Sequence, residues 1–250
     1  MRVVTLHPDV LVATSRVWQT TCTVLRGADE GFVVDSPVLP DELEVLPEVL
    51  ERAGFPFSGL LVTHADWDHL LARQSFGAEV PIGCAETTAA RLTAEPGAAQ
   101  RALRAFDDEH YVERPPLSLG AVQALPVPGH LEVGGRELEL HPADGHTDDG
   151  MAIWAPWAGV LVCGDYLSPV EIPGFVSRSA YLATLARLEP LVEQADWVVP
   201  GHGEPLDGAR AMAILREDRA YLEALPDASL PLARRTAAQK RLHEQNLQRL

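Results

Sequence analysis

Residues 64–69 read His-Ala-Asp-Trp-Asp-His and directly follow a short apolar run, so this segment offers four potential metal ligands in six residues. On an extended chain leaving a strand, His64 and Asp66 stand at i and i+2 and therefore point to the same side. Asp68 and His69 follow where the chain would turn into a helix, and they can reach a second position beside the first. The segment therefore predicts a site for two metal ions rather than one, whereas a solvated Asp/His helix start is the alternative interpretation of these six residues alone.

Three later segments make that alternative weaker. His146 lies in the glycine-containing stretch Asp-Gly-His-Thr, Asp165 follows an apolar run and a glycine, and His202 stands between two glycines after another apolar run. A buried strand has no reason of its own to end on an unpaired carboxylate. Active groups are common at strand ends, and glycine lets the backbone approach a ligand closely.

These segments, together with Asp35 after Phe-Val-Val, resemble the metallo-β-lactamase fold superfamily in residue type and in order, from about residue 30 to residue 205. The resemblance implies an α/β (α+β) fold, an αββα sandwich of two mixed sheets with helices on the outer faces and a binuclear site at one edge. By position, it implies one metal bound by His64, Asp66 and His146, a second bound by Asp68, His69 and His202, Asp165 as the bridge, and Asp35 orienting ligands from behind.

Local patterns predict the elements of such a fold, within a single domain of residues 1–250. Strands are expected at 3–6, 10–13, 20–26, 32–35, 60–63, 138–141, 151–155, 159–163 and 197–199. Helices are expected at 41–53, 67–75, 85–92, 98–107, 180–194 and 206–224, with Pro47 delaying or kinking the first. A helical tail over about residues 226–250 is expected either to pack through Leu242, Leu247 and Leu250 or to form an oligomer contact.

Composition limits the partners. The net charge of −16 repels nucleic acid and anionic membranes at long range, and 46% hydrophobic residues suffice for one large core. The longest apolar stretch, residues 151–163, is too short to span a bilayer as a helix. Three widely spaced cysteines and no apolar signal core favour a reducing cytosol. We therefore expect a cytoplasmic protein with a small-molecule substrate, no nucleic-acid or membrane partner, and possible homo-oligomers.

Asp66 departs from the pattern, because the family usually has histidine at this position. Asp66 can bind the metal as a carboxylate, it can be too short and leave that metal weak or absent, or the site can hold a single iron on His64, His146 and Asp165. In the first case, three carboxylates and a bridging hydroxide cancel the charge of two divalent ions, whereas histidine would leave one positive charge. An oxygen-rich site also moves the preference from zinc toward iron or manganese.

The sequence thus predicts a metal-dependent hydrolase with two divalent ions, zinc first and iron or manganese as alternatives. A metal-bridging water, whose pKa falls toward ~7, would attack as hydroxide on an ester, thioester or lactone while Asp68 orients it. The competing hypotheses are a non-haem iron persulfide dioxygenase and a non-catalytic metal-binding protein with a decayed site. A true β-lactamase is not expected, because the bridging position holds Asp165 rather than cysteine. Candidate pocket residues are Trp67, which can instead be core, Tyr166, Ser168 and Arg178, and Cys163 is expected to be a small buried apolar residue.

Overall fold

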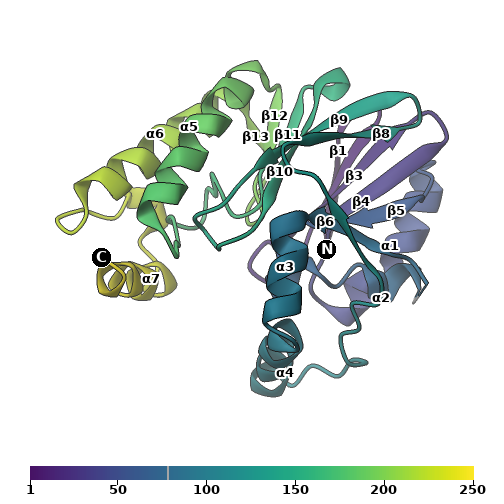
Figure 1. Ribbon diagram of the computed structural model, residues 1–250, viewed down its shortest axis with the longest axis horizontal. Coiled ribbons are helices and arrows are strands. Elements are labelled where there is room, and N and C mark those ends of the chain that lie inside the picture. The colour runs from purple at the N-terminus through teal and green to yellow at the C-terminus, as the bar shows by residue number, and fades with distance from the viewer. Residues whose placement is uncertain (78) are drawn as a thin grey trace.

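The computed structural model describes residues 1–77 and 79–250, and these residues form two mixed β-sheets (Figure 1). The first sheet has seven strands in chain order, antiparallel from β1 to β4 and parallel from β4 to β7. Its strands are β1 Arg2–His7, β2 Val10–Thr14, β3 Thr21–Gly27, β4 Glu30–Asp35, β5 Gly59–Leu61, β6 Ile82–Ala85 and β7 Val122–Leu125.

The second sheet has six strands in the order β13-β12-β11-β10-β9-β8, with one parallel pair, β11 and β12. Its strands are β8 Gly129–Val133, β9 Arg136–Pro142, β10 Met151–Ala155, β11 Val160–Val162, β12 Trp197–Val199 and β13 Leu206–Asp207. Between residues 115 and 141 the sequence predicts only the end of β9, so β7 and β8 are strands that the local pattern does not predict. β13 likewise occupies the first two residues of a predicted helix.

Seven α-helices and three short 3-10 helices complete the described chain. The α-helices are α1 Pro40–Ala53, α2 Arg73–Phe76, α3 Glu86–Ala94, α4 Ala98–His110, α5 Arg178–Gln194, α6 Gly208–Ala224 and α7 Ala237–Gln248. The 3-10 helices are η1 Trp67–His69, η2 Pro156–Ala158 and η3 Leu232–Arg234. The single helix expected at 67–75 is therefore two pieces, η1 and α2. None of these helices is both long and apolar enough to cross a membrane.

The strand periodicity produces the layers. In β2, Val10 and Val12 face the core between the sheets, while Leu11 and Ala13 face the helices that cover the first sheet. The inner core joins strands of both sheets, and α5 and α6 cover the outer face of the second sheet (Figure 1). The arrangement confirms the expected αββα sandwich.

Helix α1 continues through Pro47 instead of ending there. Proline has no N–H, so the carbonyl of Leu43, four residues earlier, loses its helical partner. The hydroxyl of Ser75 donates to that carbonyl at 2.7 Å. A side chain from the neighbouring α2 thus replaces the missing helical hydrogen bond.

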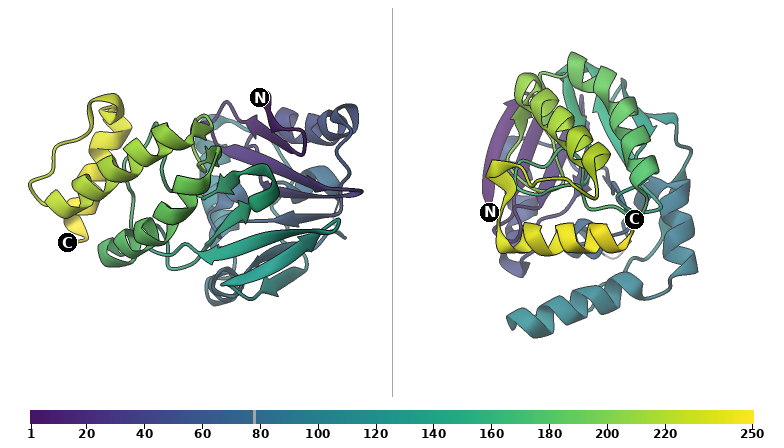
Figure 2. Two further views of the ribbon diagram at one scale, coloured as in Figure 1. Left: turned by 90° about the horizontal axis from the view of Figure 1, so that it is seen from above. Right: turned by 90° about the vertical axis from the view of Figure 1, so that its left-hand side faces the viewer.

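The C-terminal helix α7 lies across one end of the pair α5 and α6 (Figure 2), contacts Tyr221 of α6 through His243 and Asn246, and holds the loop at residues 168–176. Gln239 accepts from the N–H of Ile172, and the Asn246 amide donates to the carbonyl of Pro173 at 2.7 Å. The expectation of leucine packing is correct only for Leu242, because Leu247 and Leu250 are 37% and 54% exposed. Polar side chains, rather than an apolar stripe, fix this helix to the loop.

Candidate metal centre

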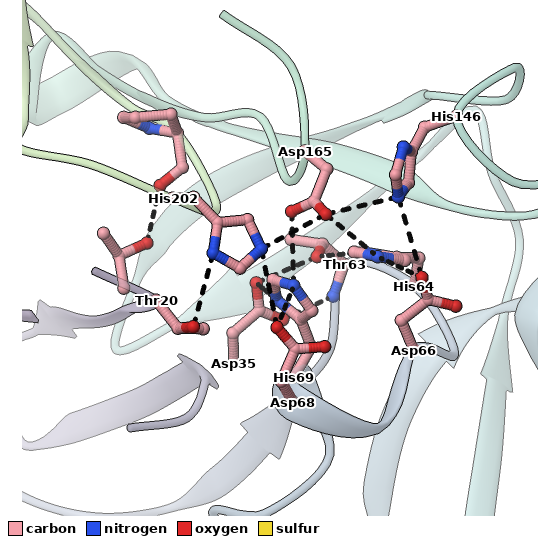
Figure 3. Close-up of polar contacts among 12 residues, drawn as sticks. Thr20, Asp35, Thr63, His64, Asp66, Asp68, His69, His146, Asp165 and His202 are labelled. Atoms are coloured by element: carbon pink, nitrogen blue, oxygen red, sulfur yellow. Dashed lines mark hydrogen bonds and ion pairs between the residues drawn. The ribbon is translucent and has the colours of Figure 1, made fainter. Parts of the chain in front are cut away.

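Seven side chains predicted as ligands converge at one edge of the two sheets (Figure 3). His64 follows β5, and η1 carries Asp68 and His69 one turn later. From the second sheet, Asp165 follows β11 and His202 follows β12. Because β11 and β12 are parallel neighbours, their carboxyl ends deliver these two residues to the same edge.

Asp165 lies at the centre of the cluster. Its Oδ1 is 3.2 Å from Nε2 of His69, and its Oδ2 is 3.2, 3.3 and 3.8 Å from Nε2 of His146, His202 and His64. One carboxylate therefore faces all four histidines, which is the position that the bridging role requires.

The remaining ligand atoms form two groups on either side of Asp165. His64, Asp66 and His146 make one group, and Asp68, His69 and His202 make the other, with the ligand atoms of each group within 4.8 Å of one another. This is the division that the resemblance implies. The donors are imidazole nitrogens and carboxylate oxygens, a set suited to zinc, manganese or iron.

Unpartnered buried atoms supply an independent test of whether a metal fits. Nε2 of His64, His69 and His146 and Oδ1 of Asp165 are buried, and no hydrogen-bond partner is found for them among the described residues. Buried polar atoms without a partner are costly and rare, and here four of them face one another. Two metal ions, one in each group with Asp165 between them, would satisfy all four atoms, so the residues fit the binuclear site that the fold family implies.

Each histidine is held through its other ring nitrogen. Nδ1 contacts Thr63 Oγ1 (3.0 Å) in His64, Asp35 Oδ2 (3.0 Å) in His69, the Gly174 carbonyl (2.7 Å) in His146, and Thr20 Oγ1 and the Trp18 carbonyl (both 3.3 Å) in His202. The hydroxyls of Thr63 and Thr20 donate elsewhere, to Asp35 and to the Val17 carbonyl, so both can accept an imidazole N–H. These contacts direct Nε2 of every histidine toward the centre.

Asp35 has the supporting position predicted for it. It lies at the end of β4 with a positive φ of 60°, and its carboxylate accepts from the backbone N–H and hydroxyl of Thr63 and contacts Nδ1 of His69. It therefore stands behind His69 as seen from the centre. The left-handed backbone of a non-glycine residue next to a site is strain that the surrounding hydrogen bonds maintain.

Glycine allows the two ligand loops to meet. A Cβ added to Gly201 would lie 2.1 Å from Oδ1 of Asp165 and 3.1 Å from Cε1 of His69. No side chain larger than hydrogen fits between the loop of His202 and the central carboxylate. This explains the glycine before His202 that the sequence singled out.

Asp66 reaches the centre and is also bound from outside. Its Oδ2 lies 3.7 Å from Nε2 of His64 and 3.6 Å from Nε2 of His146, and its Oδ1 is 2.8 Å from the guanidinium of Arg91. Arg91 in turn contacts buried Asp149 at 2.8 Å. Sequence reasoning missed both Arg91 and Asp149. The only sequence signal for Asp149 is its position three residues after His146. Arg91 is one of many arginines in the chain and lies on a helix that carries no ligand.

The pocket candidates occupy different surroundings. Trp67 packs against Trp18 and Phe106 and also lines a cavity of about 140 Å³ beside Asp66. Tyr166 is buried, and its hydroxyl donates to the Asp144 carbonyl and accepts from the backbone N–H of His146. It therefore supports a ligand loop.

The other two candidates also make contacts with the backbone. The hydroxyl of Ser168 donates to the carbonyl of His202, and Arg178, at the start of α5, contacts the carbonyl of Leu225 beyond the end of α6. Cys163 is fully buried, as expected, with its thiol directed at the carbonyl of Tyr166. Of the histidines outside the ligand set, His141 ends β9 beside Glu139, and His243 contacts Tyr221.

The carboxylates of the cluster favour protonation of the histidines that would bind the metals. Burial lowers the pKa of His202, but Asp165, Glu171 and Asp68 outweigh it and raise the pKa to about 9. Burial is likewise outweighed by neighbouring carboxylates at His69 and His146, whose pKa values lie well above the usual range. The same histidines hold the pKa of Asp165 well below its usual range despite burial.

Metal binding to the metal-free protein should therefore strengthen as pH rises from about 6 to about 9. Histidines with raised pKa values still carry protons at neutral pH and lose them as the pH approaches about 9, and a metal must displace those protons before it can bind Nε2. Chelator competition across this range, with calorimetry in two buffers of different ionisation enthalpy, should show release of more than one proton per protein near pH 7. An affinity independent of pH would contradict the assignment of Nε2 as the ligand atoms.

Comparisons with known proteins bear on the family and the fold of the chain. Residues 15–202 match the family described as Metallo-beta-lactamase superfamily. No curated protein sequence gives a significant match. Similar solved structures include a metallo-beta-lactamase family protein from Thermus thermophilus, with 23% identity, coverage of 88% of this chain and 81% of that chain, and a TM-score of 0.68.

Two further similar structures are a lactamase and a sulfatase by name. A metallo-beta-lactamase from Pontibacter korlensis has 20% identity, with 86% of this chain and 98% of that chain covered and a TM-score of 0.61. The inverting sec-alkylsulfatase Pisa1 from Pseudomonas sp. has 16% identity and a TM-score of 0.71, with 90% of this chain but only 42% of that chain covered. Identities this low establish a common fold and leave the substrate open.

Proposed function

Because this chain belongs to the metallo-β-lactamase superfamily, which supports a metal-dependent hydrolase-type role, we propose that it hydrolyses an ester, thioester or lactone of a small molecule. The observation that carries the proposal is the convergence of four histidine Nε2 atoms on Asp165, with every Nδ1 held by a hydrogen-bond partner. A ligand set fixed in this way is prepared for catalysis.

We propose two divalent ions, zinc first, with iron or manganese favoured to the extent that Asp66 makes the site oxygen-rich. When bound, such ions supply a water of lowered pKa as nucleophile and polarise the carbonyl under attack. Asp68 is buried and lies 3.4 Å from His202 and 3.7 Å from His69. Its carboxylate would hold the attacking water in line while ligating.

The substrate is proposed to be small because the space beside the centre is small. The cavity of about 140 Å³ next to Asp66 is lined by Trp67, Leu92 and the first turn of α4. It accommodates a compact acyl or leaving group. We propose Asp165 as the bridging ligand, at a position where a true β-lactamase is expected to have cysteine, and for that reason we do not propose a β-lactam as the substrate.

Two further parts of the proposal rest on composition. Three buried, free cysteines favour a reducing compartment, and we propose the cytoplasm. The charge of −16 disfavours nucleic acid and anionic membranes as partners, and homo-oligomers remain a prediction.

The alternative chemistry, a persulfide dioxygenase, would use one iron on His64, His146 and Asp165. Those three residues do lie together, with Asp165 3.2 Å from His146 and 3.8 Å from His64. However, Asp68, His69 and His202 form an equally compact group that a single iron would leave without an ion. The second group is the observation that favours the binuclear hydrolase.

The experiment is metal analysis of the purified protein, followed by parallel assays of ester, thioester, lactone and phosphodiester hydrolysis and of oxygen uptake with a persulfide. We expect two metals per chain and a kcat/KM above about 10⁴ M⁻¹s⁻¹ for the preferred carbonyl substrate. Activity should disappear on chelation and return with zinc or manganese. Oxygen uptake with one iron per chain would replace the proposal, and full metal content without turnover on any substrate would contradict it.

A further inference from the structure

Arg91 connects the least usual member of the ligand cluster to the rest of the fold. It lies on α3, outside every ligand segment, and its guanidinium uses two nitrogens: NH2 contacts Oδ1 of Asp66 and NH1 contacts Oδ1 of Asp149, both at 2.8 Å. Asp149 is 1% exposed, and its other oxygen accepts from the backbone N–H of Ala65, next to Asp66. Both terminal nitrogens of the Arg91 guanidinium are therefore held by a carboxylate.

This contact decides which oxygen of Asp66 faces the centre. With Oδ1 held by Arg91, Oδ2 is the atom 3.7 Å from Nε2 of His64 and 3.6 Å from Nε2 of His146. An aspartate has two rotatable side-chain bonds, and this side chain is 32% exposed, so a free Asp66 could turn toward solvent. A planar guanidinium, unlike a point charge, fixes the direction of the carboxylate.

The same contact places a positive charge beside the carboxylates of the cluster. Asp66, Asp68 and Asp165 bring three negative charges to the cluster, and Asp149 adds a fourth beside it. Arg91 is the guanidinium within hydrogen-bond distance of two of these four. Charge compensation at such short range makes a carboxylate-rich site less costly to assemble.

We propose that Arg91 is a positioning residue that makes Asp66 a working metal ligand, by directing Oδ2 at the metal position and by offsetting the charge of the carboxylate. The inference rests on the proposed metal function but concerns metal binding rather than the substrate. The competing explanation is purely structural: Arg91 would only attach α3 to the core through Asp149.

A double-mutant cycle separates the two. In Arg91→Leu, we expect the metal site that includes Asp66 to lose about 10- to 100-fold in affinity, with stoichiometry falling from two ions toward one. Arg91→Lys should recover part of the loss, because lysine supplies charge but not the forked geometry. In an Asp66→His background, Arg91 has no carboxylate to direct, so Arg91→Leu should change affinity less than about threefold there.

Affinity is measured by zinc and manganese competition with chelators, and unfolding of the metal-free variants is followed in parallel. Arg219→Leu is the matched control, since Arg219 pairs with Glu189 at 2.7 Å, with similar exposure, on the remote helices α5 and α6. It should leave affinity unchanged.

Equal losses of affinity in the wild-type and Asp66→His backgrounds would overturn the proposal in favour of the structural explanation, as would full affinity in Arg91→Leu. Because metal binding is measured without substrate, a protein that hydrolyses nothing can still confirm the role of Arg91. A wild-type protein that binds no metal would overturn both this inference and the proposed function.

Discussion

Asp165→Asn should lower kcat/KM by about a thousandfold or more and remove most of the bound metal. Asp165 is the carboxylate that faces the Nε2 atoms of all four histidines, at 3.2 to 3.8 Å. Asparagine preserves the volume but replaces one oxygen by an NH₂ group that cannot bind a cation. Both halves of the centre should therefore weaken together, which no other single substitution in the cluster would do.

The fold should survive this change, because Asp165 stabilises protonated histidines and its removal lets them become neutral. Metal content, turnover and thermal unfolding of the metal-free variant are the three measurements. Asp108→Asn, a change of the same kind in an exposed ion pair on α4, is the control and should behave as wild type. Two bound metals with turnover within about tenfold of wild type would show that Asp165 does not bridge.

Arg234→Met should destabilise the protein by about 3–5 kcal/mol. Arg234 is 1% exposed and lies in η3, where it contacts buried Asp218 at 2.5 Å and donates to the carbonyls of Glu171 and Ser168. Methionine fills the space but leaves the Asp218 carboxylate and two carbonyls without their partner. The loop at 168–176 would loosen, and with it the Gly174 carbonyl that holds His146.

The loss of stability in Arg234→Met should depend on pH, because it involves the carboxyl group of Asp218. Even beside Arg234, burial raises the pKa of Asp218 to about 7, and loss of Arg234 removes the contribution that opposes burial. A carboxyl whose pKa is higher in the folded than in the unfolded state costs stability as pH rises above its unfolded value. Denaturant unfolding should therefore show a larger loss in Arg234→Met near pH 8 than near pH 5.

The double variant Arg234→Met/Asp218→Leu is the control, since it removes both charges. Replacing a buried pair by apolar residues of similar volume is often neutral, so much of the lost stability should return. If the double variant is as unstable as the single one, the carbonyl contacts rather than the buried charge account for the loss.

The fold was predictable where local pattern and burial coincide. Strands β2 and β10 are continuously buried, and their apolar runs predict them well. Strand β7 carries exposed Gln123 and Ala124 and lies at a sheet edge after a proline-rich stretch, so its pairing with β6 leaves little trace in its own residues. The polar packing of α7 was likewise hidden, because its buried residues include Gln239 and Asn246.

The candidate site shows the same division. Its seven ligand-type residues could be predicted because each follows a strand or turn within a recognisable segment. Arg91 could not be predicted from its neighbours, because its guanidinium meets Asp66, 25 residues earlier, only in the folded chain. The tethers on Nδ1 include backbone carbonyls, such as that of Gly174, which carry no residue-specific signal at all.

The centre also lies at the interface between the first and second sheets, which come from the N-terminal and C-terminal halves of the chain. Thr21, in the first sheet, donates its N–H to the carbonyl of Gly201 and its hydroxyl to the carbonyl of Pro200, and Thr20 pairs with His202. During synthesis, a nascent chain can expose His64 and His69 long before Asp165 and His202 leave the ribosome. An early half-site would offer ligands without the central carboxylate. We therefore expect a metal to bind only once both halves of the chain have folded together, so that the ions present at that stage select the metal.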